Sequence, residues 1–324
     1  MLAGAAAAGA SDQDIWKKSG LHDQEDRALR RGLDVPGYVH LSRAVTTTIN
    51  DEFMGLANRP QPIGVFALVA AHASHARTVG DAGTRIAHFF DLMDNSFRFS
   101  FVEKSQEGQF RIGRIPGHRI HNELLPETIL LTVHRLIAWL GGQYEAISQV
   151  WFDYSRPGHA GVYEQFFLGA MATFDRDSCG FSISGKTLGR PILRTEAQAM
   201  TWARRTPLDA LMPVQVNSPL AMDISSVIEN HLERHASLPS LRETAASLHL
   251  ADYTLRRRLK REGGDYLRLR SQIRRDLAIR LLNSTLDPIE EIARRVGYSE
   301  ASAFVRAFKM WTGLSPGVYR RGEG

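Results

Sequence analysis

The chain has 324 residues, enough for two domains of ordinary size. Hydrophobic residues make up 43% and charged residues 23% of it, the balance of a globular protein, and no apolar run is long enough to cross a membrane. The single cysteine, Cys179, excludes an internal disulfide and a multi-cysteine zinc site. Such cysteine usage suits the reducing cytoplasm, where we expect the protein to work.

Charge is distributed unevenly along the chain. From Leu238 to the C-terminus there are 17 Lys and Arg against 10 Asp and Glu, a net charge of +7. The whole chain carries +5, so the residues before Leu238 sum to −2. A basic domain attached to a mildly acidic one indicates nucleic-acid binding confined to one end, although basic faces are often only solvated surface.

The first 36 residues are predicted to be a leader. The opening MLAGAAAAGA is alanine-rich and lacks a basic start, so it is neither a signal peptide nor a membrane anchor, and we expect it to fray. A helical run over residues 23–31 carries three arginines, Arg27, Arg30 and Arg31. Charge runs of this kind are usually solvated, but this one directly precedes a folded domain.

Residues 37–211 are predicted to form a mixed α/β (α+β) regulatory domain. Phe97, Phe99 and Phe101 alternate with polar residues, the period of a half-buried strand, and a turn at 107–108 leads into a return strand. The other elements expected in this domain are helices over residues 83–93 and 126–140 and strands over residues 147–152, 170–174 and 180–183.

The last third of the chain, residues 223–324, is predicted to be an all-helical domain. Residues 212–222 are expected to be the linker before it, because prolines recur there with few charges. A helix over residues 224–235 should open the domain. Its further parts are a helix-turn-helix over residues 240–264, a linking helix over residues 266–283 and a second helix-turn-helix over residues 287–313.

Capping residues mark the two helix-turn-helix segments. Ser240 and Glu243 fit a capping box at the start of the first. In the second, we expect Asp287 to cap the first helix with Glu290 at the reciprocal position, and Ser299 to cap the second helix. In such a motif the second helix enters the major groove of DNA.

A set of residues at fixed spacing distinguishes the last segment from a generic helical pair. They are Ile292-Ala293, Val296-Gly297-Tyr298, Ser302, Phe304, Arg306, Phe308-Lys309, Gly313, Ser315-Pro316 and Tyr319-Arg320. With these residues the segment closely resembles the second helix-turn-helix of AraC/XylS-type transcription regulators. The resemblance implies a DNA-binding regulator and not an enzyme, with operator DNA, the transcription machinery and a second copy of the chain as partners. Residues 150–193 resemble, more loosely, the arabinose-binding type of effector domain, which implies a small-molecule effector.

The first helix-turn-helix departs from the family pattern at two positions. The usual turn glycine is His249, and the usual capping serine is Ala251, which leaves Asp252 as a substitute cap. A non-glycine residue at positive φ is strained, so we expect this module to be less rigid than the second.

Seven side chains are predicted to meet DNA. The family places base-reading side chains at the outward positions of each second helix, while lysines there suit phosphates, which set register but not sequence choice. Of the outward residues on the last helix, Arg306 has the longest reach. The predicted DNA-binding residues are Tyr253, Arg256, Arg257, Lys260, Ser302, Arg306 and Lys309.

The leader arginines weakly resemble the RxxxR motif of PilZ-type cyclic di-GMP receptors. Guanidinium groups are planar and bidentate, which suits both phosphate binding and stacking on guanine. The second PilZ motif is only half present, because Phe99 replaces its glycine. Another small metabolite, or a domain that only dimerises, remains an alternative. The predicted ligand-binding residues are Arg27, Arg30, Arg31, Asp94 and Ser96.

The sequence gives only weak indications of metal binding or catalysis. His72 and His75 are only two potential metal donors, so no metal site is predicted. Cys179 lies near Asp175 and Asp177, which disfavour the thiolate that a nucleophilic cysteine needs. We therefore predict no catalytic residues and no cofactor.

Overall fold

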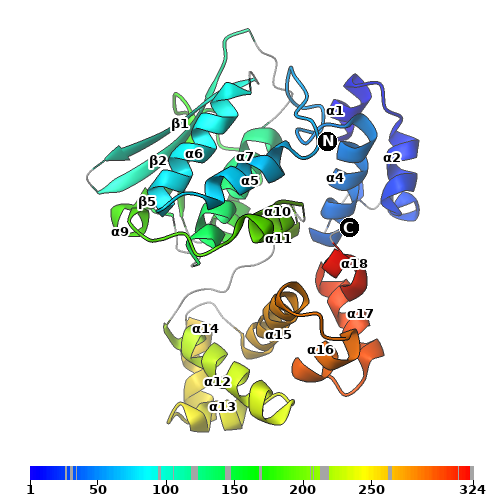
Figure 1. Ribbon diagram of the computed structural model, residues 1–324, viewed down its shortest axis with the longest axis vertical. Coiled ribbons are helices and arrows are strands. Elements are labelled where there is room, and N and C mark those ends of the chain that lie inside the picture. Colours follow the sequence, from blue (N-terminus) through cyan, green and yellow to red (C-terminus); the bar gives the residue numbers. More distant parts are fainter. Residues whose placement is uncertain are drawn as a thin grey trace. The chain divides into compact units, whose positions relative to one another are not determined.

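The computed structural model divides the chain into two compact units, Met1–Met212 and Pro213–Gly324 (Figure 1). Within the described part of the chain, no helix has both the length and the apolar character needed to cross a membrane. The described residues are 1–25, 28–29, 32–33, 35–93, 96–104, 106–117, 123–142, 147–167, 170–204, 206, 208–211, 219–261, 265–312 and 314–321.

The first unit contains a five-stranded sheet with the strand order β1-β2-β5-β3-β4 (Figure 1). Neighbouring strands are antiparallel except β3 and β4, which run parallel. The predicted mixed α/β fold is confirmed, and the strands expected over residues 147–152, 170–174 and 180–183 are found with ends one or two residues away. The turn predicted at residues 107–108 is wrong, because both residues belong to β2 and pair with Lys104 and Glu103 of β1. The strands are β1 Phe97–Lys104, β2 Glu107–Arg114, β3 Gln149–Trp151, β4 Met171–Thr173 and β5 Cys179–Ser184.

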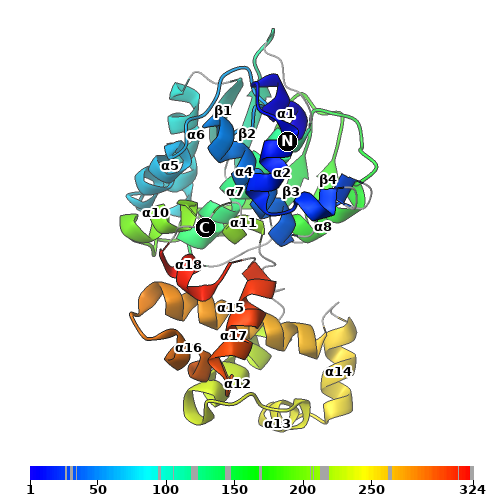
Figure 2. The same ribbon diagram turned by 90° about the vertical axis from the view of Figure 1, so that its right-hand side faces the viewer.

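One face of this sheet is apolar and carries the core. Phe99 pairs with Ile112, and Phe110 pairs with Phe181, whose ring stacks on it with the centroids 5.4 Å apart. Helix α6 packs on β1 and helix α7 on β5, so the alternation of apolar and polar residues in the strands is explained by one covered face (Figure 2). The helices after the N-terminal segment are α5 Val65–Ser74, α6 Val79–Leu92, α7 Leu124–Leu140, α8 Tyr163–Phe166, α9 Gly185–Leu188, α10 Glu196–Arg204 and α11 Leu208–Leu211, with the 3-10 turn η2 Ala160–Val162.

The N-terminal residues belong to this core, contrary to the expectation that they fray. Ala5 and Trp16 are buried within the same hydrophobic cluster as the sheet. Gly4 lets the first helix approach the backbone of a loop closely, because a Cβ at this position would lie 2.4 Å from the carbonyl oxygen of Met54. The first 20 residues therefore pack against the rest of the unit. The elements here are α1 Leu2–Ala7, α2 Asp12–Ser19, η1 His22–Gln24 and α4 Val35–Ile49.

The second unit contains helices joined by turns, with no strand among its described residues. Its first helix begins at Pro219, so residues 219–222, predicted as linker, are its first turn. Pro316 likewise begins a helix, the last one of the unit. Proline fits both places because its fixed φ suits the first helical turn and its missing N–H is not needed there. The helices are α12 Pro219–His235, α13 Leu241–Ser247, α14 Asp252–Arg261, α15 Tyr266–Ser284, α16 Ile289–Arg295, α17 Ala301–Thr312 and α18 Pro316–Arg321.

Candidate nucleic-acid interface

Two helix-turn-helix modules, α13–α14 and α16–α17, share the same turn geometry. In the first, the N–H of Leu250 donates to the carbonyl of Ala245 at 2.9 Å. In the second, the N–H of Tyr298 donates to the carbonyl of Ala293, also at 2.9 Å. A bond of this span closes a helix C-terminus and requires the residue before the donor to be left-handed. The two turns are therefore built alike although their sequences differ.

His249 and Gly297 are those left-handed residues. Their φ angles are +55° and +78°, so the positive φ expected at the non-glycine turn residue His249 is confirmed. The left-handed conformation costs a residue with a side chain about 1–2 kcal/mol, which glycine avoids. Gly297 is also needed for space, because a Cβ there would lie 2.9 Å from Cδ2 of Leu232. Only the first turn holds this strain.

The caps of the first module are partly as predicted. The Ser240 hydroxyl accepts from the N–H of Glu243 at 3.2 Å, and the Glu243 carboxylate accepts from the N–H of Ser240 at 2.7 Å, which confirms the capping box. Asp252, however, is the first residue of α14 and not its cap. Its carboxylate accepts from the N–H of Tyr253 at 2.8 Å, so it still satisfies one free N–H of the first turn.

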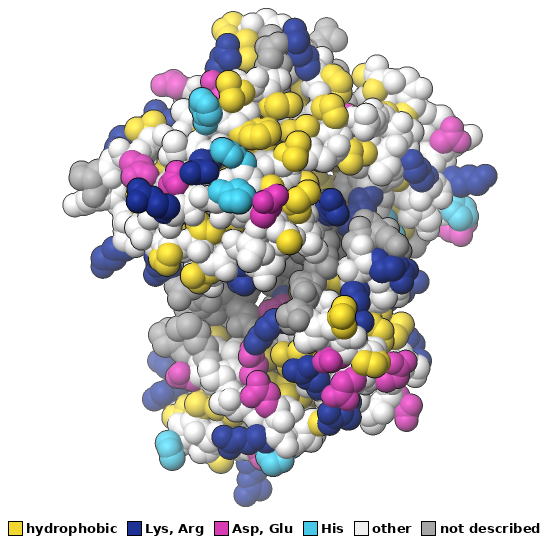
Figure 3. All heavy atoms as spheres, viewed as in Figure 1, with side chains coloured by type: hydrophobic (Ala, Val, Ile, Leu, Met, Phe, Trp, Pro, Cys, Tyr) yellow, Lys and Arg dark blue, Asp and Glu magenta, His cyan; other side chains and the backbone are white. Residues whose placement is uncertain are grey.

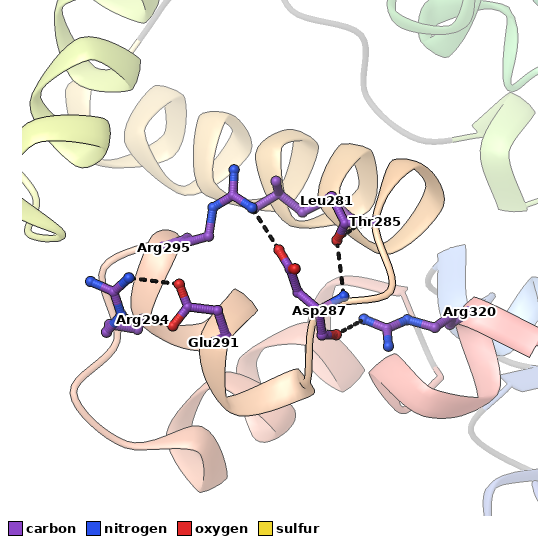
Figure 4. A network of polar contacts seen from close by, with 7 residues as sticks. All are labelled: Leu281, Thr285, Asp287, Glu291, Arg294, Arg295 and Arg320. Atoms are coloured by element: carbon purple, nitrogen blue, oxygen red, sulfur yellow. Dashed lines mark hydrogen bonds and ion pairs between the residues drawn. The ribbon is translucent and has the colours of Figure 1, made fainter.

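The caps predicted for the second module are wrong. Asp287 does not cap the first turn of α16: its Oδ2 accepts from Nη1 of Arg295, the last residue of that helix, at 2.7 Å, and its backbone carbonyl accepts from Nη2 of Arg320 at 2.6 Å (Figure 4). Because these partners hold Asp287, it forms no capping box with Glu290, and Pro288 occupies the N-cap position instead. Helix α17 begins two residues after Ser299, so that serine does not cap it either.

Helix α17 buries one face and exposes a polar one. Phe304 and Phe308 are fully buried. Ser302, Arg306 and Lys309 are exposed and, at spacings of four and three, lie along one stripe. Within the described residues, neither of these two cations has an ion-pair partner, so both charges are available to a nucleic acid.

The cations of α14 divide between two directions. Tyr253 is 70% exposed, and the guanidinium of Arg257 lies 5.9 Å from its ring centroid. Arg256 and Lys260, also four apart, instead line a cavity of about 630 Å³ together with Arg270 at the start of α15. The two neighbouring arginines that the sequence grouped together therefore have different surroundings.

Helix α15 connects the two modules as one continuous element. It packs on α12, α16 and α18, with Ile273, Leu277 and Leu281 buried. The helix therefore shares a buried core with the first helix of the unit and with the second module.

Met310 is a residue at this surface that the sequence interpretation missed. It is 72% exposed and follows Arg306 by four residues, which places it on the same stripe. An apolar side chain there can contact the methyl group of thymine. The signal was available in the sequence, because Met310 falls away from the face defined by Phe304 and Phe308.

The predicted ligand-binding residues do not form a described site. Ser96 is fully buried, and its hydroxyl accepts from the N–H of Asn58 at 2.7 Å. That hydroxyl is out of reach of solvent, so Ser96 cannot help to hold a ligand in this conformation. The remaining predicted residues, Arg27, Arg30, Arg31 and Asp94, lie outside the described residues.

Cys179 is an inert buried thiol. Burial, and then the carboxylate of Asp153, raises the pKa of Cys179 far above its usual range. Its Sγ donates to Oδ1 of Asp153 at 3.1 Å, so Asp153 and not the nearby Asp175 or Asp177 is the controlling neighbour. Across the described part of the chain, no group of three or more side chains is arranged to hold a metal ion.

Two helix-turn-helix modules with exposed cationic second helices define a DNA-binding transcription regulator. Comparison with known families agrees: residues 9–192 match the model of the N-terminal arabinose-binding domain of AraC transcription regulators, and residues 244–322 match a helix-turn-helix domain. The chain belongs to the AraC family of transcription regulators, with an N-terminal effector domain and a DNA-binding helix-turn-helix domain. It is not an enzyme.

Individual relatives are distant. The ornithine utilization regulator of Pseudomonas aeruginosa is 29% identical over 194 residues, which is 60% of this chain and 56% of that protein. The regulator VirS of Mycobacterium tuberculosis is 24% identical over 308 residues, 93% of this chain and 87% of VirS. Among solved structures, the transcriptional regulator CdpR of Pseudomonas aeruginosa aligns over 92% of this chain and 90% of its own, at 21% identity and a TM-score of 0.32. The chain thus spans about half the length of the ornithine utilization regulator.

Proposed function

We propose that one copy of the chain reads two successive major-groove faces of an operator, one with α14 and one with α17. The observation that carries this proposal is the pair of like-built turns, each followed by a helix with an exposed cationic stripe. Major-groove faces on one side of DNA recur every 34–36 Å or about 10–10.5 base pairs. The continuous helix α15 is the element that would set this spacing.

The surroundings of each side chain support a division of roles. Arg306 on α17 and Arg257 on α14, which lies beside Tyr253, are exposed and are proposed to contact base edges, where an arginine can bind guanine with two hydrogen bonds. Lys309 and Lys260 are proposed to contact phosphates. Arg256 shares its cavity with Lys260 and is reassigned to the phosphate-binding group. Tyr253 and Ser302 complete the two surfaces.

The direct test is selection of duplex DNA from a random pool by the full chain, followed by binding measured over a range of salt concentrations. We expect a bipartite recognition sequence and an affinity that falls steeply with salt, because neutralised phosphates release counterions. The same affinity for selected and scrambled duplexes would contradict sequence-specific regulation.

We make two alternative proposals for the identity of the effector. The spacing of Arg27 and Arg31 is the only support for cyclic di-GMP. Membership of the effector-domain family supports a different small metabolite. The name of the ornithine utilization regulator adds amino acids to the compounds to screen. Calorimetry with cyclic di-GMP on the wild type and on Arg27→Ala/Arg31→Ala separates them. No heat at tens of micromolar, or equal affinity in the double variant, ends the dinucleotide proposal.

We also propose that the first unit pairs with a second copy of the chain. The support is a set of exposed apolar side chains, including Leu92 at 70% exposure, and Figure 3 shows hydrophobic side chains gathered on the face of this unit that carries α5. Sedimentation velocity at micromolar concentrations, with Leu92→Lys as the variant and Leu286→Lys in the second unit as the control, tests it. A monomer under these conditions would leave the effector domain without a dimerising role.

A further inference from the structure

We infer that the first unit binds a small organic carboxylate in a cavity on the outer face of its sheet. The inference rests on the proposed function, because it assigns a site and a ligand class to the effector. The cavity has a volume of about 290 Å³ and lies over strands β2, β3 and β4 and the β4–β5 connection. Pockets for drug-sized ligands run from about 300 to 1,000 Å³, so this one suits a small metabolite better than a dinucleotide.

The register of the sheet brings distant polar residues together on this face. Gln109 of β2 pairs with Ser182 of β5, which pairs with Gln149 of β3. Paired residues of neighbouring strands point to the same side, so both amides flank the serine. Ser182 is only 1% exposed, and within the described residues its hydroxyl has no hydrogen-bond partner.

A second row of residues forms the apolar wall. Gly180 of β5 pairs with both Arg111 and Trp151. A Cβ on Gly180 would lie 2.4 Å from Cζ2 of Trp151, so the indole occupies the space that a side chain at this position would need. Next to it, the Oγ1 atom of Thr173 is also buried without a partner among the described residues. A buried hydroxyl left unpaired is unfavourable, and a bound polar molecule that supplies a partner relieves this.

Arg111 supplies the charge. Its side chain is half-buried, and its Nε and Nη2 donate to Oε1 of Gln109 at 3.2 and 2.5 Å. The Gln109 amide is fixed in turn, because its Nε2 donates to Glu107. In the described part of the chain no carboxylate pairs with Arg111. A guanidinium partly removed from water gains most from a carboxylate, which it binds with two parallel hydrogen bonds.

The β4–β5 connection places charges of both signs on the rim. Asp175 is left-handed at φ +56°, and its N–H donates to the carbonyl of Tyr154 at 3.1 Å. The N–H of Arg176 donates to the carbonyl of Phe152 at 3.0 Å, so the connection is fixed at two points. Arg176 and Asp177 both line the cavity. Asp177 would accept an ammonium group, which separates amino acids from other carboxylates.

A polar outer face is the ordinary state of an antiparallel sheet with one buried side. Three features distinguish this one: a guanidinium with only an amide for a partner, the cavity-lining Thr173 whose hydroxyl has no partner among the described residues, and a tryptophan packed against a glycine. Each would be satisfied by the same occupant, a small molecule with a carboxylate and an apolar part.

The test measures ligand binding to the full chain by thermal shift and by calorimetry. The separate probes are the twenty amino acids, succinate, 2-oxoglutarate and cyclic di-GMP. Three variants are compared with the wild type. Arg111→Gln removes the charge, and Thr173→Val removes a hydroxyl at constant shape. Arg98→Gln is the matched control, because Arg98 lies on the same face of neighbouring β1 but outside the cavity.

We expect at least one amino acid or dicarboxylate to raise the melting temperature of the wild type and of Arg98→Gln. The same probe should bind Arg111→Gln about tenfold or more weakly, since a charge-assisted pair is lost, and Thr173→Val more weakly to a smaller degree. A preference for amino acids over dicarboxylates would assign Asp177 the ammonium.

Two results overturn the inference. One is equal affinity for wild type and Arg111→Gln while the unliganded variants melt at the same temperature, which places the effector elsewhere. The other is binding of cyclic di-GMP or of no probe at all, which rejects the ligand class. Neither touches the DNA-binding function, because operator affinity is measured on the same samples without probe.

Discussion

The guanidinium of Arg274 lies 3.5 Å from the ring centroid of Tyr298 and joins the long helix α15 to the turn of the second module. Its Nε donates to the carbonyl of Val296 at 2.8 Å and its Nη2 to the carbonyl of Gly297 at 3.0 Å. These carbonyls end α16, where backbone acceptors lack helical partners and positive charge is favoured. One side chain therefore fixes the turn that aims α17.

Replacing Arg274 with lysine should destabilise the second unit. Lysine keeps the charge but loses the planar fork that meets two carbonyls and the stacking on Tyr298. We expect the free energy of unfolding in urea to fall by about 1–3 kcal/mol. The control is Arg294→Lys, whose pair with Glu291 is exposed to solvent and should contribute little to stability. Equal losses in both variants would show that Arg274 acts only as a surface charge.

Replacing His249 with glycine and replacing Gly297 with alanine should change the stability of the second unit in opposite directions. His249→Gly removes the left-handed strain of about 1–2 kcal/mol and adds about 0.5–1 kcal/mol of backbone entropy, so a net gain in stability is expected. Gly297→Ala should lower the free energy of unfolding by more than about 1 kcal/mol, because the new Cβ collides with Leu232 and the alanine must adopt a left-handed conformation. Calorimetric melting temperatures decide it. A shift of the same sign in both variants is incompatible with the strain assigned to His249.

Two residues of α17 should affect DNA binding in different ways. Arg306→Ala is expected to relax the preference at one or two base pairs, worth about 1–3 kcal/mol of discrimination. Lys309→Ala should weaken binding to all sequences alike and lower the salt slope by about one unit. Parallel salt titrations on selected and scrambled duplexes separate the two effects. Uniform weakening by Arg306→Ala would make it a phosphate contact.

The second unit should fold without the first, if its fragment begins early enough. Helix α12 starts at Pro219, and Ala221 in its first turn is buried. A fragment of residues 219–324 should therefore show cooperative unfolding by circular dichroism and bind DNA. The fragment 223–324, which lacks that turn, should melt at a lower temperature. If neither fragment is folded, the first unit is part of this core.

Local features of the helical domain could be predicted from the sequence, and those that depend on distant residues could not. Phe304 with Phe308, and Ser240 with Glu243, are separated by four and three positions, so helix geometry alone brings each pair together. Asp287 satisfies the same local rule yet pairs with Arg295, because a nearby guanidinium competes for its carboxylate.

The candidate ligand site was not predictable for the same reason. Gln109 and Gln149 are 40 positions apart in the printed sequence and meet only through the register of β2, β5 and β3. The leader arginines, by contrast, form a pattern visible in the sequence, because Arg27 and Arg31 are only four positions apart. The alternation of apolar and polar residues indicates that the sheet has one polar face. The same alternation does not reveal that Ser182 on that face is buried.

Hydroxyl-radical footprinting with methylation interference on the selected operator tests the central claim most directly. For the wild type we expect two groups of major-groove contacts about 10–10.5 base pairs apart on one side of the duplex. Arg257→Ala should remove guanine contacts from one group only, and Arg306→Ala from the other only. A single protected group, or loss of the same contacts in both variants, would contradict the reading of DNA by two separate helices of one chain.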